Sequence, residues 1–297
     1  MAKAEAVVQP IGLWAMSPRR GRPWHVTLRR NKRMVIGGVL LLFVLLAGVL
    51  APWLAAQDPN TVRPEIRLAV PSGSHYFGTD NMGRDLYSRT VHGARTSLEV
   101  GGFVALLAAL AGTLCGLLSG YYRRVDLLLM RIMDGMMAFP GIVLAVGIMA
   151  ALGPHVANVI VALSVVQTPR VVRVVRSVAM SIRHMQYVEA AQSVGGSDTR
   201  ILLRHILPNC ISPLIVQATF IFGEAVLGEA SLSFLGVGAP PEVASWGTIL
   251  GEARVYIRNA PWMMFLPGSA LTLTVLALNL VGDGIRDWLD PRLRRST

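Results

Sequence analysis

The sequence predicts an all-α fold, a polytopic membrane bundle of about six transmembrane helices. Hydrophobic residues make up 53% of the 297 positions and charged residues only 15%, whereas a soluble domain carries about 25% charged residues. The mean hydropathy is accordingly high, at +0.51. The apolar residues also gather in runs of the length that a helix needs to cross a bilayer, about 20 residues. Together these observations favour a membrane fold over a soluble one.

Six apolar runs are long enough to be membrane spans. The first follows a long polar or mixed segment, which fits a retained helix better than a cleaved signal peptide. Gly and Pro recur inside the runs, at Pro140 and Pro169 for example, and membrane bundles tolerate them because neighbouring helices satisfy the freed backbone groups. The expected spans are residues 34–56, 98–120, 127–152, 156–177, 210–234 and 263–281.

Arginine and lysine set the expected orientation, because positive charge gathers at the cytoplasmic ends of membrane helices. Basic residues from Arg19 to Arg33 precede the first span, and Arg292, Arg294 and Arg295 follow the last. Six crossings place both ends in the cytoplasm. The segment 57–97 strains this rule, since it lies outside yet carries five arginines that four acids only partly balance. A net charge of +11 could also indicate nucleic-acid binding, but no soluble basic module appears, so we expect no nucleic-acid partner.

These spans divide the chain into expected regions. They are a cytoplasmic basic N-terminal tail at 1–33, the first transmembrane helix at 34–56, an extracytoplasmic segment at 57–97, a core transmembrane domain at 98–285 that contains a cytoplasmic loop at 180–208, and a cytoplasmic C-terminal tail at 286–297.

The cytoplasmic loop is predicted to form two short helices around a break. Gly195-Gly196 would stop the first helix, Ser197 or Asp198 would cap the second, and Pro208 would end it before the next span. The small residues of the first helix would let another protein approach closely, while Glu189 and Arg204 offer charged contacts. The residues alone leave an ordinary amphipathic loop as an equal alternative.

This loop resembles the signature of the inner-membrane permeases of binding-protein-dependent ABC importers. That signature has Glu-Ala-Ala, three residues, Gly, nine residues, Ile, one residue and Leu-Pro. The matching positions here are Glu189, Ala190, Ala191, Gly195, Leu207 and Pro208. His205 stands where the general pattern has Ile, and the run from His205 through Ile206 to Asn209 is instead similar to the dipeptide, oligopeptide and nickel branch.

Further blocks in the same order resemble that branch over residues 34–295. They include Phe77-Gly78-Thr79-Asp80, Glu229-Ala230-Ser231-Leu232-Ser233-Phe234 and Ser245-Trp246-Gly247. The arrangement is similar to the second, C-type permease of the pair. The resemblance implies the permease fold of type I ABC importers in the bacterial inner membrane and a heterodimer with a second homologous permease. It also implies two cytoplasmic ABC ATPases that bind ATP and Mg, and an extracytoplasmic solute-binding protein. The loop from Glu189 to Pro208 would couple to the ATPases.

Several catalytic motifs are missing from the sequence. There is no Gly-x-x-x-x-Gly-Lys-Ser/Thr loop to cradle phosphates, no His-Glu-x-x-His metal site and no Gly-x-Ser-x-Gly turn. We therefore expect no enzyme activity, catalytic residue, metal site or cofactor in this chain, and ATP hydrolysis by partner subunits.

Charged residues at membrane depth are often functional. We expect Glu224 and Glu229 in the fifth span to be candidates for the pathway or gate, with packing as the alternative for Glu229. Arg170, Arg173 and Arg176 are interpreted as snorkelling anchors at the inner boundary, where their charged heads reach water. Arg131 and Asp134, one helical turn apart, are expected to pair with each other. Trp246 is a candidate contact for the solute-binding protein, because aromatic residues dominate interfaces.

The expected substrates are short peptides, with nickel chelates, glutathione-like peptides and opines left open. A proton-coupled secondary carrier is the first rival, in which Glu224 and Glu229 would be the coupling acids. Such carriers usually have inverted repeats, and none is visible. A membrane-embedded enzyme is the second rival, but the missing motifs leave it no chemistry.

Overall fold

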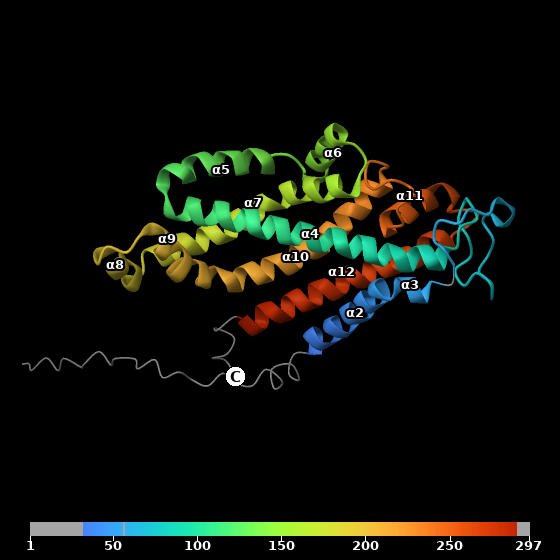
Figure 1. Cartoon of the computed structure of the whole chain (residues 1–297), viewed down its shortest axis with the longest axis horizontal. Coiled ribbons are helices and arrows are strands. Elements are labelled where there is room, and N and C mark those ends of the chain that lie inside the picture. The colour runs from blue at the N-terminus through green and yellow to red at the C-terminus, as the bar shows by residue number, and fades with distance from the viewer. Residues whose placement is uncertain (1–31, 56, 290–297) are drawn as a thin grey trace, which may run out of the picture.

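The computed structural model describes residues 32–55 and 57–289, and in this part of the chain the architecture is helical (Figure 1). The helices are α2 (Lys32–Val49), α3 (Ala51–Leu54), η1 (Pro64–Ile66), α4 (Leu86–Tyr121), α5 (Arg123–Met137), α6 (Gly141–Leu152), α7 (Val156–Arg183), α8 (Gln186–Ser193), α9 (Asp198–Ile201), the π-helical turn η2 (Leu202–Ile206), α10 (Leu207–Phe234), α11 (Trp246–Tyr256) and α12 (Trp262–Leu289).

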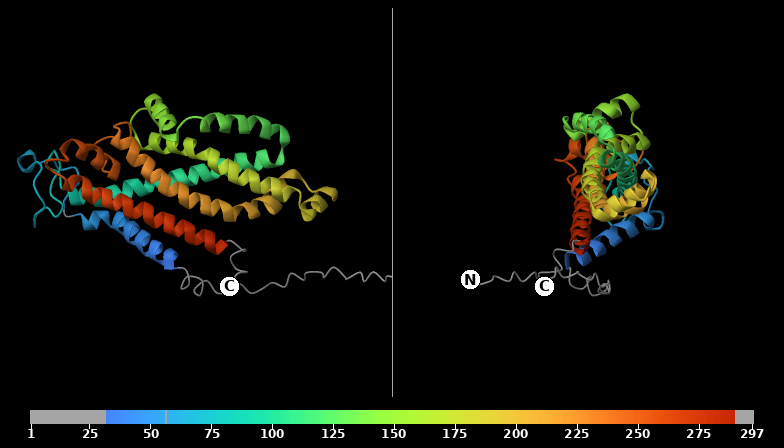
Figure 2. Two further views of the ribbon diagram at one scale, coloured as in Figure 1. Left: turned by 180° about the vertical axis from the view of Figure 1, so that it is seen from behind. Right: turned by 90° about the vertical axis from the view of Figure 1, so that its left-hand side faces the viewer.

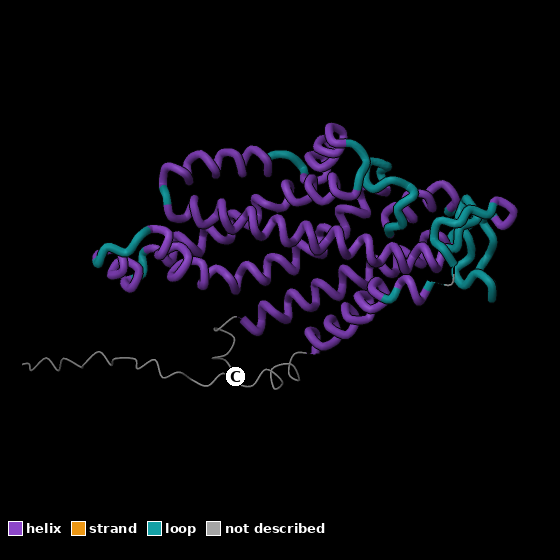
Figure 3. Tube along the Cα trace, in the orientation of Figure 1, coloured by secondary structure: helices purple, strands orange, loops and turns teal. Residues whose placement is uncertain are grey.

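The long helices form one bundle around α4. Helices α7, α10 and α2 all pack against α4, while α12 packs against α2 and α10. Helices α5 and α6 lie on the opposite side of the bundle from α2 (Figures 1 and 2). Most of the loop structure gathers at the end that holds residues 57–85, and the small helices α8 and α9 lie at the other end (Figure 3). The bundle therefore has two distinct ends.

Five helical runs are long and apolar enough to cross a membrane, namely α2, α4, α7, the continuous run from α9 to α10, and α12. The pair α5 and α6 supplies a sixth crossing if it spans as one unit. The prediction of an all-α bundle with about six spans is confirmed.

The expected span over 127–152 is broken into two helices. Helix α5 ends at Met137, α6 begins at Gly141, and the two axes differ by 93°. The break falls at Pro140, which has no backbone N–H to donate and disfavours helical geometry in the residue before it. The third crossing is therefore a bent pair of helices.

Helix α4 begins twelve residues earlier than position 98, where the second span was expected. Its first residue is Leu86, because the Asp85 carboxylate accepts the Ser88 N–H at 2.8 Å and caps the helix. The last part of the expected extracytoplasmic segment 57–97 is therefore helical. With 36 residues α4 is about 54 Å long, so its first turns extend beyond a bilayer core of about 30 Å.

Three glycines spaced four residues apart bring α4 and α7 into close contact. They are Gly112, Gly116 and Gly120. A Cβ added at Gly112 would lie 2.4 Å from the Val171 Cβ, and one at Gly116 would lie 2.7 Å from the Val175 Cβ. Small residues at this spacing let membrane helices pack backbone to backbone. This contact, the glycine seam, positions α7, whose end leads into the predicted cytoplasmic loop.

Residues 57–85 pack onto α11 through buried charges. The Arg84 guanidinium bonds to Asp80 at 2.5 Å and to Glu252 of α11 at 2.6 Å. Arg89 lies 3.5 Å from the other Glu252 oxygen. Burial raises the pKa of the Glu252 carboxyl, and the positive charges of Arg89 and Arg84 oppose that rise. This network holds the loop-rich end together.

The start of α2 and the end of α12 lie toward the end of the bundle that carries α8 and α9 (Figure 1). Residues 57–85 and α11 lie at the opposite end. The expected basic tails at 1–33 and 286–297 fall largely outside the described residues, which include only Lys32 and Arg33 of the first and residues 286–289 of the second.

Candidate functional site

Helix α8 ends in a turn that only glycine adopts readily. Gly195 has φ +81°, and its N–H donates to the Gln192 carbonyl at 2.9 Å while the Gly196 N–H donates to the Ala191 carbonyl at 3.0 Å. This pair of bonds is the Schellman motif, which closes a helix with a left-handed residue. The predicted break at Gly195-Gly196 is confirmed.

The chain beyond this break is helical without interruption into the membrane span. Helix α9, η2 and α10 follow one another directly, so the expectation that Pro208 would end the second helix is wrong. Pro208 stands at the start of α10, just after the wider π turn in which the Leu207 N–H donates to the Leu202 carbonyl. Proline is tolerated there because the first turn of a helix does not need its N–H. Helices α9 and α10 therefore belong to one continuous helical run.

The second short helix is tied to the end of α4 by Asp198. Ser197 occupies the N-cap position without a side-chain cap bond. The Asp198 carboxylate accepts hydrogen bonds from the Tyr121 hydroxyl at 2.7 Å and the Tyr122 hydroxyl at 2.9 Å, and the second bond raises the pKa of Tyr122. Arg183, the last residue of α7, donates to the Tyr121 carbonyl at 2.6 Å and lies over its ring. The ends of α4, α7 and α9 are thus locked together.

Residues 184–208, called the coupling hairpin after the role expected from the sequence, expose an apolar surface, while Val188, Ile201 and Ile206 fill the core behind it. Val194 is 86% exposed. The other large apolar side chains exposed here are Met185, Tyr187 and Leu203. Of the remaining expected contact residues, Glu189, Ala190, Gly195, Arg204 and Pro208 are exposed, Ala191, Gly196, His205 and Leu207 are half-buried, and Ile206 is buried. An exposed apolar surface at the tip of a bundle is typical of a protein contact.

Three ion pairs follow one another along α7. Arg170 pairs with Glu224 of α10, Arg173 with Asp134 of α5 at 2.8 Å, and Arg176 with Asp126 of α5 at 2.7 Å. The expected pairing of Asp134 with Arg131 is therefore wrong, because Asp134 reaches across to α7. Each of the arginines interpreted as a snorkelling anchor thus has a carboxylate partner from a neighbouring helix.

Glu229 is fully buried near the loop-rich end of the bundle. Its carboxylate accepts hydrogen bonds from Ser97 at 3.2 Å, Ser233 at 2.9 Å and Ser245 at 2.7 Å. Ser97 lies in α4 and Ser233 in α10, and Ser245 is the residue that caps α11. A buried polar group is stable only when it is hydrogen-bonded, so Glu229 holds three helices in one arrangement.

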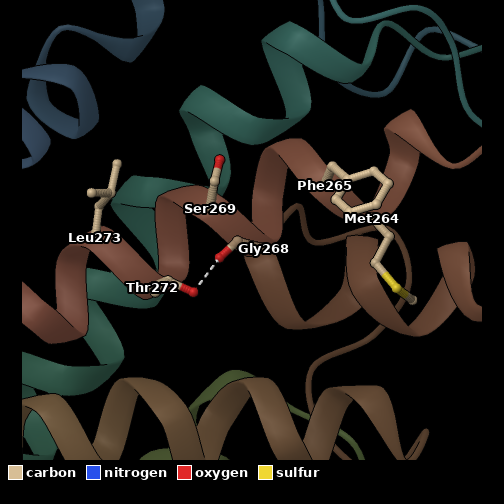
Figure 4. Close-up of a pocket in the computed structure, with 6 residues that line it drawn as sticks. All are labelled: Met264, Phe265, Gly268, Ser269, Thr272 and Leu273. Atoms are coloured by element: carbon tan, nitrogen blue, oxygen red, sulfur yellow. Dashed lines mark hydrogen bonds between the residues drawn. The ribbon is translucent and has the colours of Figure 1, made fainter.

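An open pocket of about 550 Å³ lies on α12 (Figure 4). Its two hydroxyl groups already bond to the backbone of the helix, Ser269 to Leu266 at 2.8 Å and Thr272 to Gly268 at 2.8 Å. The pocket is lined by Met264, Phe265, Gly268, Ser269, Thr272 and Leu273. None of these six lining residues is charged.

Comparison with protein families matches residues 109–295 to the inner membrane component of binding-protein-dependent transport systems. Residues 23–71 match the N-terminal transmembrane domain of oligopeptide transport permease C. The first match covers more than half of the chain. The chain belongs to this permease family. It is a multi-pass inner-membrane subunit of an ABC transporter and is not itself an ATPase.

The relatives of this permease share most of its length. A protein of Brucella abortus named for a peptide transport system permease is 52% identical over 90% of both chains. The dipeptide transport system permease protein of Alkalihalophilus pseudofirmus is 43% identical over 92% of this chain and 91% of its own. The glutathione transport system permease protein of Escherichia coli is also 43% identical, with the same coverage.

Trp246 is not available as a surface contact in this permease. Its side chain is 1% exposed, and its indole N–H donates to the Thr90 carbonyl at 3.0 Å. The expectation that it meets the solute-binding protein is corrected, because the ring fills the space between α11 and α4. The two flanking residues have structural roles. Ser245 caps α11, and Gly247 allows a close helix contact, because a Cβ there would lie 2.6 Å from the Ala230 Cα.

Sequence reasoning missed two groups of residues in this permease. Tyr121, Tyr122 and Asp198 anchor the coupling hairpin. Tyr122 and Asp198 are 76 residues apart in the sequence, so no local pattern predicts their hydrogen bond. The glycine seam of α4 was visible in the sequence as glycines at a constant spacing of four, a small-residue pattern typical of helix contacts in membranes.

Proposed function

We propose that this permease and a second homologous permease form the pathway of an importer for short peptides. Two cytoplasmic ATPases, which bind ATP and Mg, would dock on the coupling hairpin, and an extracytoplasmic solute-binding protein would deliver the peptide at the end that holds residues 57–85 and α11. The names of the relatives, which include peptide and dipeptide permeases, support this substrate class.

The anchored hairpin is the observation that carries the proposal. It exposes Val194 and Tyr187, is fixed to the end of α4 through Asp198, and continues without a break into α10. A push on such a surface moves a membrane helix as a rigid body, which is how domain rotations transmit a change from one site to another. Both chain termini would then lie on the cytoplasmic side with the hairpin.

The two candidate acids take different roles in this proposal. Glu229, which accepts hydrogen bonds from three serine hydroxyls, would keep the outer ends of α4, α10 and α11 together and so support the outer gate. Glu224 is about half exposed and pairs with Arg170, so it would face the pathway.

Reconstitution of the whole complex in lipid vesicles tests the proposal. ATP-dependent uptake of a labelled dipeptide is measured with all subunits present, and the control complex carries ATPases that cannot hydrolyse ATP. We expect uptake only with active ATPases and the binding protein. Uptake that proceeds without ATP and collapses with a proton uncoupler would instead identify a secondary carrier. Competition by glutathione, a nickel chelate or an opine would identify another substrate of the same importer class.

A further inference from the structure

The ion pair between Arg170 and Glu224 lies near the middle of α7 and is about half exposed. Arg170 is separated by 14 residues from the start of α7 and by 13 from its end, which puts it about 20 Å from either end. The side chains of Arg170 and Glu224 are 48% and 46% exposed. Charged groups at this depth almost always face a bundle interior or a watery cavity rather than lipid. We therefore expect the Arg170 and Glu224 pair to face the interior of the assembled transporter or a water-filled cavity, and not lipid.

Gln167 lies beside the Arg170 and Glu224 pair and has a hydrogen-bond acceptor without a partner. The Gln167 amide donates to the Glu224 carboxylate at 3.0 Å, but its oxygen Oε1 is buried without a hydrogen-bond partner. Gln167 is only 7% exposed. A buried acceptor without a partner has a free-energy cost, and a donor supplied by a ligand would remove that cost. The cluster thus combines a cation, an anion and an unused acceptor.

We propose that Arg170, Glu224 and Gln167 form a binding site within the membrane for the charged ends of a zwitterionic peptide in transit. The peptide ammonium would be held by the Glu224 carboxylate and the Gln167 oxygen, and the peptide carboxylate by the Arg170 guanidinium. The ion pair stabilises the empty pathway, and the peptide replaces it with two equivalent pairs. This inference rests on the proposed peptide importer and names the residues that would contact its substrate.

The spacing along α7 suits a short peptide. Arg173 and Arg176 repeat the arginine at intervals of three residues, or about 4.5 Å along the axis. An extended dipeptide spans about 7 Å, which exceeds the interval between consecutive arginines, so a peptide bound at one ion pair would overlap the next. The paired acids Asp134 and Asp126 come from α5. The series leads from the centre of α7 toward the coupling hairpin.

Three variants of the complete reconstituted transporter test the site, namely Glu224→Gln, Arg170→Met and the double variant. Glu99→Gln is the matched control, because Glu99 forms an ion pair of similar exposure with Arg95 in the first half of α4. The readouts are subunit stoichiometry, basal ATP hydrolysis and the initial rate of dipeptide uptake. We expect uptake at low peptide concentration to fall about tenfold or more in each single variant, since hydrogen bonds to charged groups are among the strongest. The Glu99→Gln control should keep normal stoichiometry, basal hydrolysis and uptake.

The double variant separates substrate binding from a structural role. If the pair only holds α7 to α10, removing both charges together should restore uptake, because a neutral pair often replaces an ion pair without loss. If it binds peptide, the double variant should transport no better than the worse single variant. Recovery of uptake in the double variant, or unchanged uptake in both single variants of an active transporter, would overturn the site. Absence of ATP-dependent peptide uptake in the unmodified complex would instead refute the proposed function.

Discussion

Substitution of Gly195 gives the sharpest test of how the coupling hairpin is built. Gly195 has φ +81°, and a Cβ there would have no atom within 4 Å. Gly195→Ala should therefore destabilise the folded hairpin through backbone strain alone, by about 1–2 kcal/mol. This free energy corresponds to a shift of about 5- to 30-fold in the equilibrium between folded and unfolded forms. Gly195→Asn should cost less, because asparagine tolerates the left-handed conformation.

Amide hydrogen exchange over residues 186–201 measures this local stability directly. We expect exchange to be about 5- to 30-fold faster in Gly195→Ala than in the unmodified permease, and closer to normal in Gly195→Asn. Exchange that is equally fast in the two variants would refute the argument from backbone conformation.

The variant Gly195→Asp separates conformation from docking. Aspartate also tolerates the left-handed conformation, so the hairpin should keep its shape. An unpaired charge buried at an interface nevertheless costs several kcal/mol, so we expect the ATPases to dissociate or to hydrolyse ATP without peptide uptake. Co-purification, hydrolysis and uptake that all remain normal would show that no ATPase covers Gly195.

Two further predictions concern packing. Trp246→Ala should lower the free energy of unfolding by about 3–5 kcal/mol, because it leaves a cavity and removes the indole donor of the Thr90 carbonyl. The yield of folded permease after detergent extraction should therefore fall. A variant that folds normally but transports poorly would instead indicate a surface role for Trp246. Gly116→Leu should prevent stable folding, since even a Cβ would lie 2.7 Å from the Val175 Cβ. Gly102→Leu on the same helix meets open space and should fold normally, and equal thermal stability of the two leucine variants would contradict the glycine seam.

The sequence was informative where structure depends on local patterns. Apolar runs located the spans because a bilayer imposes their length, and Gly195-Gly196 located the helix break because left-handed backbone favours glycine. The bend at Pro140 was not predicted, since proline inside a membrane helix is also compatible with a straight span.

The distant partners could not be read from the sequence. Asp134 lies one turn from Arg131 but bonds to Arg173, 39 residues away, and such a choice depends on how α5 packs against α7. Trp246 was misread for the same reason, because an aromatic residue beside a helix cap fits an interface and a buried corner equally well. Only the packing of α11 on α4 decides between them.

Site-directed cross-linking tests the central claim, that the coupling hairpin contacts the ATPase. Cysteines are introduced one at a time, Val194→Cys at the hairpin tip and Tyr76→Cys at the opposite end, in a permease whose Cys115 and Cys210 are replaced by alanine. Both target side chains are exposed, Val194 at 86% and Tyr76 at 62%. The complete complex is then treated with a short thiol cross-linker during ATP hydrolysis. We expect Val194→Cys to cross-link to an ATPase subunit and Tyr76→Cys not to do so; an ATPase cross-link from position 76, or none from position 194, would contradict the account.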